Sequence, residues 1–374
     1  MDKTEVAEKV RDVKIYYILM FMKKIVIFTI VAFSCIQMNA QILTGLVYDK
    51  HTNQPVYGAY VYLDGTSIVD LTDESGKFTL DVKQVINTRL VLRHLAYHTV
   101  IIETPFTHIP DTIYMEEQMN MLGEVIFRAD PFSRTQKLRA FREQFLGTTE
   151  SGRACRIVNE DDIRIWFNTA TNTLMASSEQ PIEVINAYLG YRIFFTVESF
   201  ETEYSGVTLN SNRIENVYYS VMTLFTDLNP YDERIKMRRD KIYEESSVNF
   251  FKGLAYGSNT ERTPYFTVSK NGFPIDPYLF FTIKDTLSLK MIYIPDSTVE
   301  ESSLDDSLFS INVSYRSREG SSNRYVWSHS TISFFTNTLF VDLYGNIDQG
   351  DKIVFTGMMS LRRAGDMLPL EYEP

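Results

Sequence analysis

The chain is poor in the residues that most often carry chemistry. Among 374 residues there are 2 cysteines and 5 histidines. Loss of an N-terminal leader containing Cys35 would leave Cys155 alone, so no disulfide could form within the processed chain. Two arginines flank Cys155, but no histidine lies near it in the sequence, and a nucleophilic cysteine needs such a neighbour. We therefore predict that Cys155 is a small, buried, apolar residue.

Recognised catalytic motifs are also missing. The sequence has no His-Glu-x-x-His zinc motif, Gly-x-Ser-x-Gly elbow, Walker loop, Rossmann glycine pattern or Cys-x-x-Cys pair. Adjacent acids occur at 160–162 and 305–306, but only their separation in space would make them a glycosidase pair. We therefore expect no cofactor and no metal, and a hydrolase with an unrecognised site is the less favoured alternative.

No apolar run is long enough for a membrane-spanning helix, which needs about 20 residues. The run from Ile25 to Ile36 is shorter, follows two lysines and leads to Ala40, which is the three-part pattern of a secretory signal peptide. We predict a start at Met22 and cleavage after Ala40, with export to the periplasm or the outer membrane. The alternative is a lipoprotein signal acylated at Cys35, which a bulky phenylalanine two residues earlier disfavours.

An excess of positive charge is absent as well. The chain has 37 Lys and Arg against 48 Asp and Glu, a net charge of −11. The predicted leader holds six of the basic and four of the acidic side chains, so the processed chain carries −13. Binding of nucleic acid or anionic lipid needs clustered positive charge. We therefore exclude both as main partners.

Short strands of alternating polarity fill residues 41–118. In Lys77–Val82 and Arg89–Arg93, polar and apolar residues alternate as in half-buried strands, and Asp73–Gly76 has the chemistry of a tight turn. A calcium site at this turn is the alternative, but its oxygen ligands are too few. His94 and His98 are predicted to be structural, because no carboxylate accompanies them as in zinc peptidases.

The segments Gly45–Asp49, Pro55–Leu63 and Thr72–Phe78 together resemble the carboxypeptidase regulatory-like domain. This transthyretin-like sandwich stands at the front of many secreted and outer-membrane proteins of Bacteroidetes-type bacteria. The resemblance covers residues 42 to about 117, with Ala96 where the family usually has glycine. It implies a seven-stranded, transthyretin/Ig-like β-sandwich that spaces or docks other domains and carries no peptidase residues.

Residues 119–131 are predicted to form a linker strand. Met119–Ile126 resembles the segment that joins this sandwich to the plug of TonB-linked outer-membrane receptors. The rest of the chain is too short for a receptor barrel, so only an association with TonB-dependent uptake machinery stays as an alternative. We assign residues 132–374 to a larger, antiparallel, β-rich α+β domain with two helices, which makes the whole chain mainly β.

The ends of both helices are marked in the sequence. Ser133 and Gln136 form a capping box for a helix that Gly147 ends. Residues 231–254 are predicted to form the second helix, which closes near Gly257. Strands are expected at 163–167, 173–176, 181–185, 191–200, 217–225, 279–283, 287–294, 308–315, 332–335, 339–343 and 352–358.

The candidate binding residues are Arg234, Arg238, Lys241, Arg362, Arg363, Tyr218 and Tyr219. The first three share one face of the second predicted helix, and the arginine pair suits a carboxylate or phosphate. Ion pairing within an acidic protein is the alternative for these cations. The two tyrosines suit stacking on sugar rings, against the alternative that they belong to the core.

Two segments of the second domain, 234–255 and 362–372, are similar to segments of uncharacterised Bacteroidetes envelope proteins, which implies a shared organisation and no mechanism. We interpret the chain as a non-catalytic envelope accessory protein. Its sandwich would dock or space the second domain, which would bind an envelope protein or a glycan.

Overall fold

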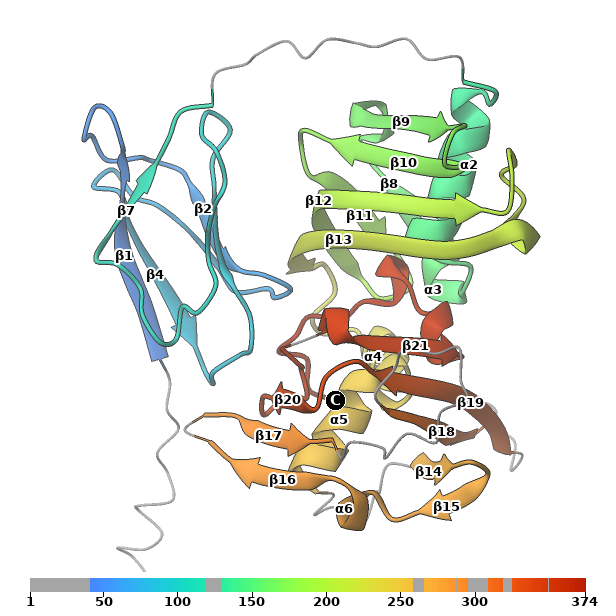
Figure 1. Cartoon of the computed structure of the whole chain (residues 1–374). Helices are drawn as coiled ribbons and strands as arrows, with labels where there is room; N and C mark the ends of the chain where they lie inside the picture. The colour runs from blue at the N-terminus through green and yellow to red at the C-terminus, as the bar shows by residue number, and fades with distance from the viewer. Residues whose placement is uncertain are drawn as a thin grey trace, which may run out of the picture. The chain divides into compact units, whose positions relative to one another are not determined.

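Seven strands at the start of the described chain form two facing sheets (Figure 1). The structure is a computed structural model, and it describes residues 41–118, 130–257, 266–286, 288–294, 309–318, 325–348 and 350–374. The predicted leader, most of the linker (119–129) and the acids at 305–306 lie outside these ranges. So do the predicted start, the cleavage site and the lipoprotein alternative.

One sheet of the sandwich has the order β4-β1-β7 and the other the order β3-β2-β5-β6. Their bounds are β1 (Gln41–Asp49), β2 (Tyr60–Leu63), β3 (Val69–Leu71), β4 (Lys77–Val82), β5 (Leu90–Arg93), β6 (Val100–Ile102) and β7 (Thr112–Met115). The alternation read from the sequence is present in β4, where Phe78, Leu80 and Val82 are buried and the intervening residues are exposed. The predicted seven-stranded sandwich is confirmed.

The turn chemistry of the sandwich follows the prediction. Asp73 Oδ1 accepts hydrogen bonds from the backbone N–H of Ser75 (2.8 Å) and of Lys77 (2.9 Å). Gly76 has a φ of +78°, which a side chain would disfavour. His94 lies in a turn and not on a strand, and its Nδ1 accepts from the N–H of Ala96 at 3.2 Å. These contacts give the residues structural roles.

After the sandwich, six strands form one sheet, which we call the second sheet of the molecule because it follows the sandwich. Its order is β8-β11-β12-β10-β9, and β13 pairs along the other edge of β12. Its strands are β8 (Cys155–Ile157), β9 (Ile163–Asn168), β10 (Thr173–Ser178), β11 (Ile182–Asn186), β12 (Tyr191–Tyr204) and β13 (Ile214–Asp227). The helix α2 (Arg134–Phe145) packs on one face of this sheet, and the short helix α3 (Glu150–Arg153) follows it. A hairpin joins β9 to β10, and Asn172 in its turn has a φ of +53°.

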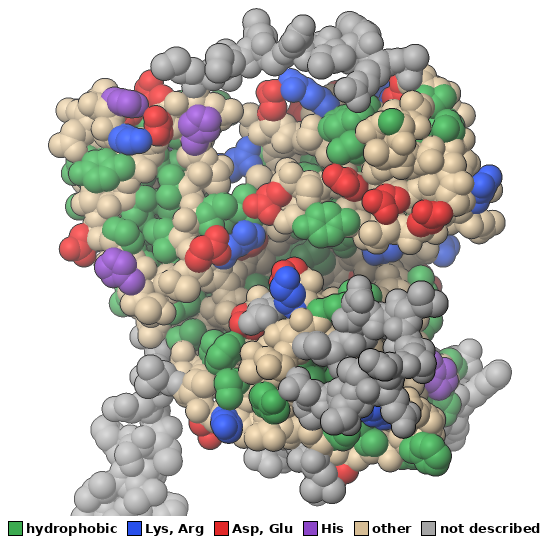
Figure 2. Space-filling model, viewed as in Figure 1, with side chains coloured by type: hydrophobic (Ala, Val, Ile, Leu, Met, Phe, Trp, Pro, Cys, Tyr) green, Lys and Arg blue, Asp and Glu red, His purple; other side chains and the backbone are tan. Residues whose placement is uncertain are grey.

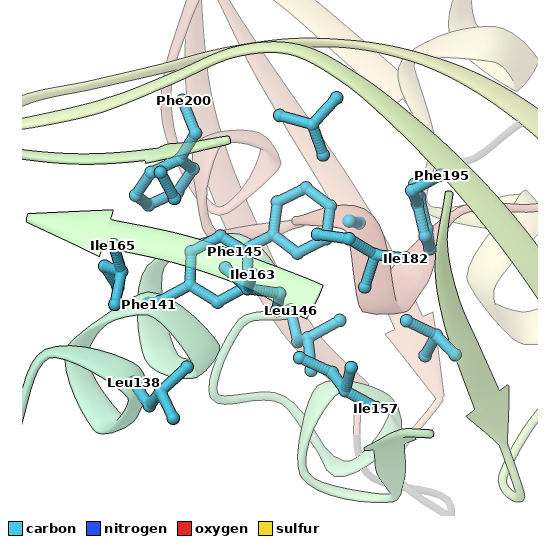
Figure 3. Packing of buried hydrophobic residues seen from close by; sticks show 14 of the residues in the cluster. Leu138, Phe141, Phe145, Leu146, Ile157, Ile163, Ile165, Ile182, Phe195 and Phe200 are labelled. Atoms are coloured by element: carbon cyan, nitrogen blue, oxygen red, sulfur yellow. The ribbon is translucent and has the colours of Figure 1, made fainter. Parts of the chain in front are cut away.

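Aromatic rings fill the core between α2 and this sheet. Figure 3 shows Phe145 at the centre of the cluster, and its ring lies 5.1 Å from that of Phe195 in an edge-to-face arrangement. Phe141 contacts Phe200 in the same way at 4.7 Å. The capping box of Ser133 and Gln136 is present as predicted, so the start of α2 is confirmed.

The remaining elements, except the first of their helices, enclose a separate hydrophobic core. The helices are α4 (Glu233–Glu244), α5 (Ser247–Tyr256) and α6 (Pro277–Phe280). One sheet has the order β15-β14-β18-β19-β21, with β14 (Phe266–Lys270), β15 (Phe273–Ile275), β18 (Phe309–Arg318), β19 (Tyr325–Phe334) and β21 (Ile353–Gly357). The other, β16-β17-β20, consists of β16 (Thr282–Asp285), β17 (Lys290–Tyr293) and β20 (Thr338–Val341). The core lies between these sheets and α5.

The prediction of one helix over 231–254 is wrong. The segment forms α4 and α5, because Ser246 caps the second helix and its Oγ accepts from the N–H of Asn249 at 3.1 Å. The apolar residues of the segment are therefore divided between two cores. Ile242 belongs to the core between α2 and its sheet, which we call the first C-terminal core, and Phe250 belongs to the separate core, which we call the second. The strand predicted at 279–283 is also wrong in its first half, which belongs to α6.

Residues Ile42–Pro374 belong to one compact unit, and backbone hydrogen bonds join the sandwich to β13. The N–H of Gly65 donates to the carbonyl of Thr223 (2.8 Å), and the N–H of Phe225 donates to that of Thr66 (2.9 Å). Asp64 accepts from the N–H of Thr223 at 2.7 Å. The loop after β2 is thereby fixed to the second sheet.

The C-terminal segment makes a further set of contacts with the sandwich. The N–H of Leu370 donates to the carbonyl of Gly65 at 2.8 Å, and Glu371 accepts from Ser67 at 2.7 Å. Asp342, fully buried, accepts from the N–H of Asn87 at 2.9 Å. Tyr344 belongs to the core of the sandwich itself. The sandwich is therefore integrated with the rest of the described chain.

Candidate binding pocket

A pocket with a volume of about 210 Å³ lies between the two C-terminal cores. Four parts of the chain form it: α3, the loop at Tyr188, the last turns of α4, and strands β18 and β19 with the segment after β21. Its lining residues are Thr149, Glu150, Ser151, Tyr188, Lys241, Ile242, Glu245, Val313, Tyr315, Ser328, Ser330, Met358, Met359, Leu361, Arg362 and Asp366. The lining combines hydroxyl groups, charges of both signs and apolar side chains.

Asp366 is the most enclosed acid of the pocket. The hydroxyl of Thr149 donates to both of its carboxylate oxygens, at 2.9 and 3.0 Å, and accepts from the N–H of Gly152 at 3.0 Å. Burial raises the pKa of Asp366, although this hydrogen bond and the charge of Arg362 act in the opposite direction. The carboxyl group is thus fixed to the N-terminus of α3.

The other two carboxylates of the pocket also have partners. Glu245 accepts from Arg362 at 2.7 Å, and Glu150 accepts from the hydroxyl of Tyr188 at 3.2 Å. The ring of Tyr188 lies under the guanidinium of Arg238, with 4.6 Å to the ring centroid. Lys241 is exposed and, within the described residues, makes no ion pair. It is the cation that the pocket offers to a ligand.

The structure brings together some of the predicted binding residues. Lys241 and Arg362 line the pocket, and Arg238 reaches it through Tyr188. Arg234 instead lines an open hollow at the start of α4, and Arg363 lies against the backbone of residue 147 at the end of α2. The predicted pair Arg362 and Arg363 therefore does not act as one clamp, since one side chain is already paired with a glutamate.

The two predicted tyrosines lie on opposite faces of β13. Tyr218 is 56 % exposed, whereas Tyr219 packs against Phe145 with 5.4 Å between the ring centroids. Successive side chains of a strand alternate between its faces, so neighbouring residues cannot form one stacking surface. Of the two, Tyr218 alone is available to a ligand.

Arg239 positions the pocket, and the sequence reading did not single it out. Its guanidinium donates to both carboxylate oxygens of Asp227, at 2.7 and 2.8 Å, and to the carbonyl of Leu189 at 2.7 Å. It also lies over the ring of Tyr191, 3.9 Å from the centroid. This buried anchor holds α4 on the second sheet. In the sequence, Arg239 stands four residues after Ile235 and three before Ile242, so helical spacing places it on their buried face.

Cys155 is half-buried, less enclosed than predicted, and its Sγ donates to the carbonyl of Ser151 at 3.4 Å. Burial raises the pKa of the Cys155 thiol to about 12, with a contribution from the charge of Asp366, and a thiol of this kind is a poor nucleophile. In the described part of the chain, no group of three or more His, Cys, Asp or Glu side chains could hold a metal ion. On the face seen in Figure 2, charged and hydrophobic side chains are interspersed.

The architecture defines this protein as one that carries a transthyretin-like β-sandwich ahead of a larger β-rich part. Comparison with protein families gives the sandwich its name: residues 43–127 match the family model of the CarboxypepD_reg-like domain. The match extends about ten residues beyond the end expected from the sequence. A search of curated proteins found no match to the chain. No helix in the described ranges is long and apolar enough to cross a membrane.

Proposed function

We propose that this protein is a non-catalytic accessory protein of a bacterial cell envelope. In this proposal the chain is exported and cleaved near Ala40, and the sandwich spaces and supports the C-terminal part. The pocket beside α4 then binds a segment of an envelope protein. The support comes from the hydrogen bonds that join the loop 64–67 to β13 and to the C-terminal segment.

The observation that carries the proposal is that every carboxylate of the pocket accepts a hydrogen bond. Glu150, Glu245 and Asp366 each accept a hydrogen bond from a neighbouring side chain, which holds them in place as recognition groups. Met358 and Leu361 are exposed on the same lining, and flexible apolar side chains adapt to a bound segment. Protein-binding sites combine fixed polar groups with apolar side chains in this way.

The test uses two charge reversals on α4. Lys241→Glu changes the pocket, whereas Arg234→Glu makes the same change of charge on the same helix outside it. We expect the processed protein to capture an envelope protein from membrane extract, the Lys241→Glu variant to lose it, and the Arg234→Glu variant to keep it. Equal capture by both variants would remove the pocket from the proposal. Recovery of a TonB-linked receptor would favour the alternative of a role in outer-membrane uptake.

A hydrolase is the second candidate, because three carboxylates line one pocket and burial raises the pKa of Asp366. An acid whose pKa is raised by burial is the kind of group that general acid catalysis uses. This candidate predicts hydrolysis of a peptide or an oligosaccharide by the wild type and its loss in the Asp366→Asn variant. Binding without turnover would favour the accessory role.

A further inference from the structure

The outer face of the sheet that contains β18 and β19 carries polar side chains in register. Ser314 pairs with His329 across the two strands, and their side chains form a hydrogen bond of 2.8 Å. Asn312 pairs with Thr331, whose hydroxyl donates to the Asn312 side chain at 2.9 Å. Residues between these positions, such as Val313, point into the core.

The polar surface extends onto the neighbouring strands. Ser269 of β14 pairs with Asn312, and Thr356 of β21 pairs with Thr331. A hollow of about 280 Å³ lies over them, lined by Ser269, Asn312, Val313, Ser314, His329, Ser330, Thr331, Thr356 and Gly357. This lining contains hydroxyl, amide and imidazole groups and no Asp, Glu, Lys or Arg side chain. The groups suit a ligand that is neutral and offers many hydrogen bonds.

An aromatic ring stands beside this hollow. Trp327 is two residues before His329 on β19, so both side chains lie on the same face of the sheet, on the order of 7 Å apart along the strand. The tryptophan is 47 % exposed, and the guanidinium carbon of Arg316 lies 6.0 Å from its ring centroid. A tryptophan presents a broad apolar face together with one hydrogen-bond donor.

We propose that this outer face is a platform that binds a neutral oligosaccharide. A sugar ring has an apolar C–H face that packs on an aromatic ring, and hydroxyls around its edge that both donate and accept. Trp327 supplies the ring, and Asn312, His329 and Thr356 supply partners for the edge. A protein-docking surface would need a contiguous apolar centre, which this polar face does not offer. The proposal goes beyond the protein binding proposed above, because it concerns a different ligand and a different surface.

The experiment titrates the processed, full-length protein with neutral hexasaccharides of glucose, xylose and mannose by calorimetry. We expect at least one of them to bind and Trp327→Ala to weaken that binding by about twofold to twelvefold, since aromatic contacts contribute about 0.5–1.5 kcal/mol. Trp166→Ala is the matched control, because Trp166 is 39 % exposed and lies on β9 of another sheet. Absence of binding by the wild type, or equal binding by Trp327→Ala, would overturn the proposal.

Two further measurements keep the test independent of folding and of the pocket. The chain has 2 tryptophans, so in Trp166→Phe the emission comes from Trp327 alone and should shift when the hexasaccharide binds. An unchanged emission at saturation would overturn the proposal that Trp327 contacts the sugar. The Lys241→Glu variant should bind the sugar as the wild type does. Loss of protein capture with retained sugar binding would thus separate the two sites, and preferential binding of polygalacturonate would contradict a neutral ligand.

Discussion

Gly65 is a residue of the sandwich whose backbone contacts the C-terminal segment. Its φ is +77°, and a Cβ at this position would lie 2.8 Å from the side chain of Leu370. Gly58 has a similar φ of +75° with no atom within 4 Å of such a Cβ, so it provides a matched control. The two positions separate the cost of the backbone conformation from the cost of the contact.

We expect Gly65→Ala to lower the free energy of unfolding by about 2–4 kcal/mol, from the left-handed conformation and from the clash together. Gly58→Ala should cost about 1–2 kcal/mol, from the conformation alone. Urea unfolding of both variants measures the difference. Equal losses would show that Leu370 does not press on this loop.

Glu371 is a half-buried acid in the same contact, and its Oε2 atom is shielded from solvent. Its Oε1 accepts from the N–H and the hydroxyl of Ser67, at 2.7 and 2.6 Å, and within the described residues its Oε2 has no hydrogen-bond partner. Burial raises the pKa of Glu371 above its ordinary value of 4.5, although the bonds from Ser67 lower it. The folded protein therefore keeps this proton to a higher pH than the unfolded chain does.

It follows that the contribution of Glu371 to the free energy of unfolding is greatest below pH 4.5 and falls as the pH rises through the folded pKa, by at most about 1.4 kcal/mol per pH unit. Glu371→Gln has no proton to lose, so the stability difference between wild type and variant should shrink or change sign as the pH rises. Urea midpoints at several pH values measure it. Glu373→Gln, at an exposed acid two residues on, should run parallel to the wild type, and a parallel curve for Glu371→Gln would contradict the argument.

At the scale of elements, Ser246 decides that two helices form where the sequence pattern predicted one. Its hydroxyl accepts from the N–H of Asn249 and donates to the carbonyl of Tyr243 at 2.6 Å, so it ends one helix and starts the next. We expect Ser246→Ala to cost about 1 kcal/mol in urea unfolding. Ser247→Ala, one position into α5, should stay within about 0.5 kcal/mol of the wild type. A similar loss in both variants would assign the effect to helix propensity instead of the cap.

Local signals explain which elements could be read from the sequence. The capping box at Ser133 and the alternation in 77–82 involve residues within one helical turn or one strand, and both were predicted correctly. The break at Ser246 was missed because the apolar spacing continues across it, although each half faces a different core. The short strands β8, β14 and β15 were missed because three to five residues carry too little periodicity.

The candidate sites were less predictable, because tertiary contacts assemble them. Thr149, Tyr188, Lys241 and Asp366 meet in one pocket from segments that are far apart in the sequence, and single-residue chemistry identified only Lys241 among them. The polar face over β18 and β19 depends on strand register, and the strand predicted at 332–335 was too short to place Trp327 on it. Register is fixed by pairing across the sheet, which one chain segment does not encode alone.

At the scale of the whole molecule, an apolar contact joins the sandwich to the second sheet. Tyr62 and Val91 of the sandwich are buried against Met222 and Leu224 of β13. Because of this contact and the hydrogen bonds of the loop 64–67, the sandwich and the second sheet stabilise each other. The sandwich and the second sheet should therefore unfold in one cooperative step.

This coupling predicts that, in urea, the transitions seen by tryptophan fluorescence and by far-UV circular dichroism coincide for the wild type. Both tryptophans, Trp166 and Trp327, lie outside the sandwich, whereas circular dichroism reports on all strands. Met222→Lys puts an unpaired charge into the contact, at a cost of several kcal/mol, and should separate the two transitions. Tyr218→Lys, at an exposed position on the same strand, should leave them together. Separate transitions already in the wild type would mean that the sandwich folds independently, and the contact would then be too weak for a supporting role.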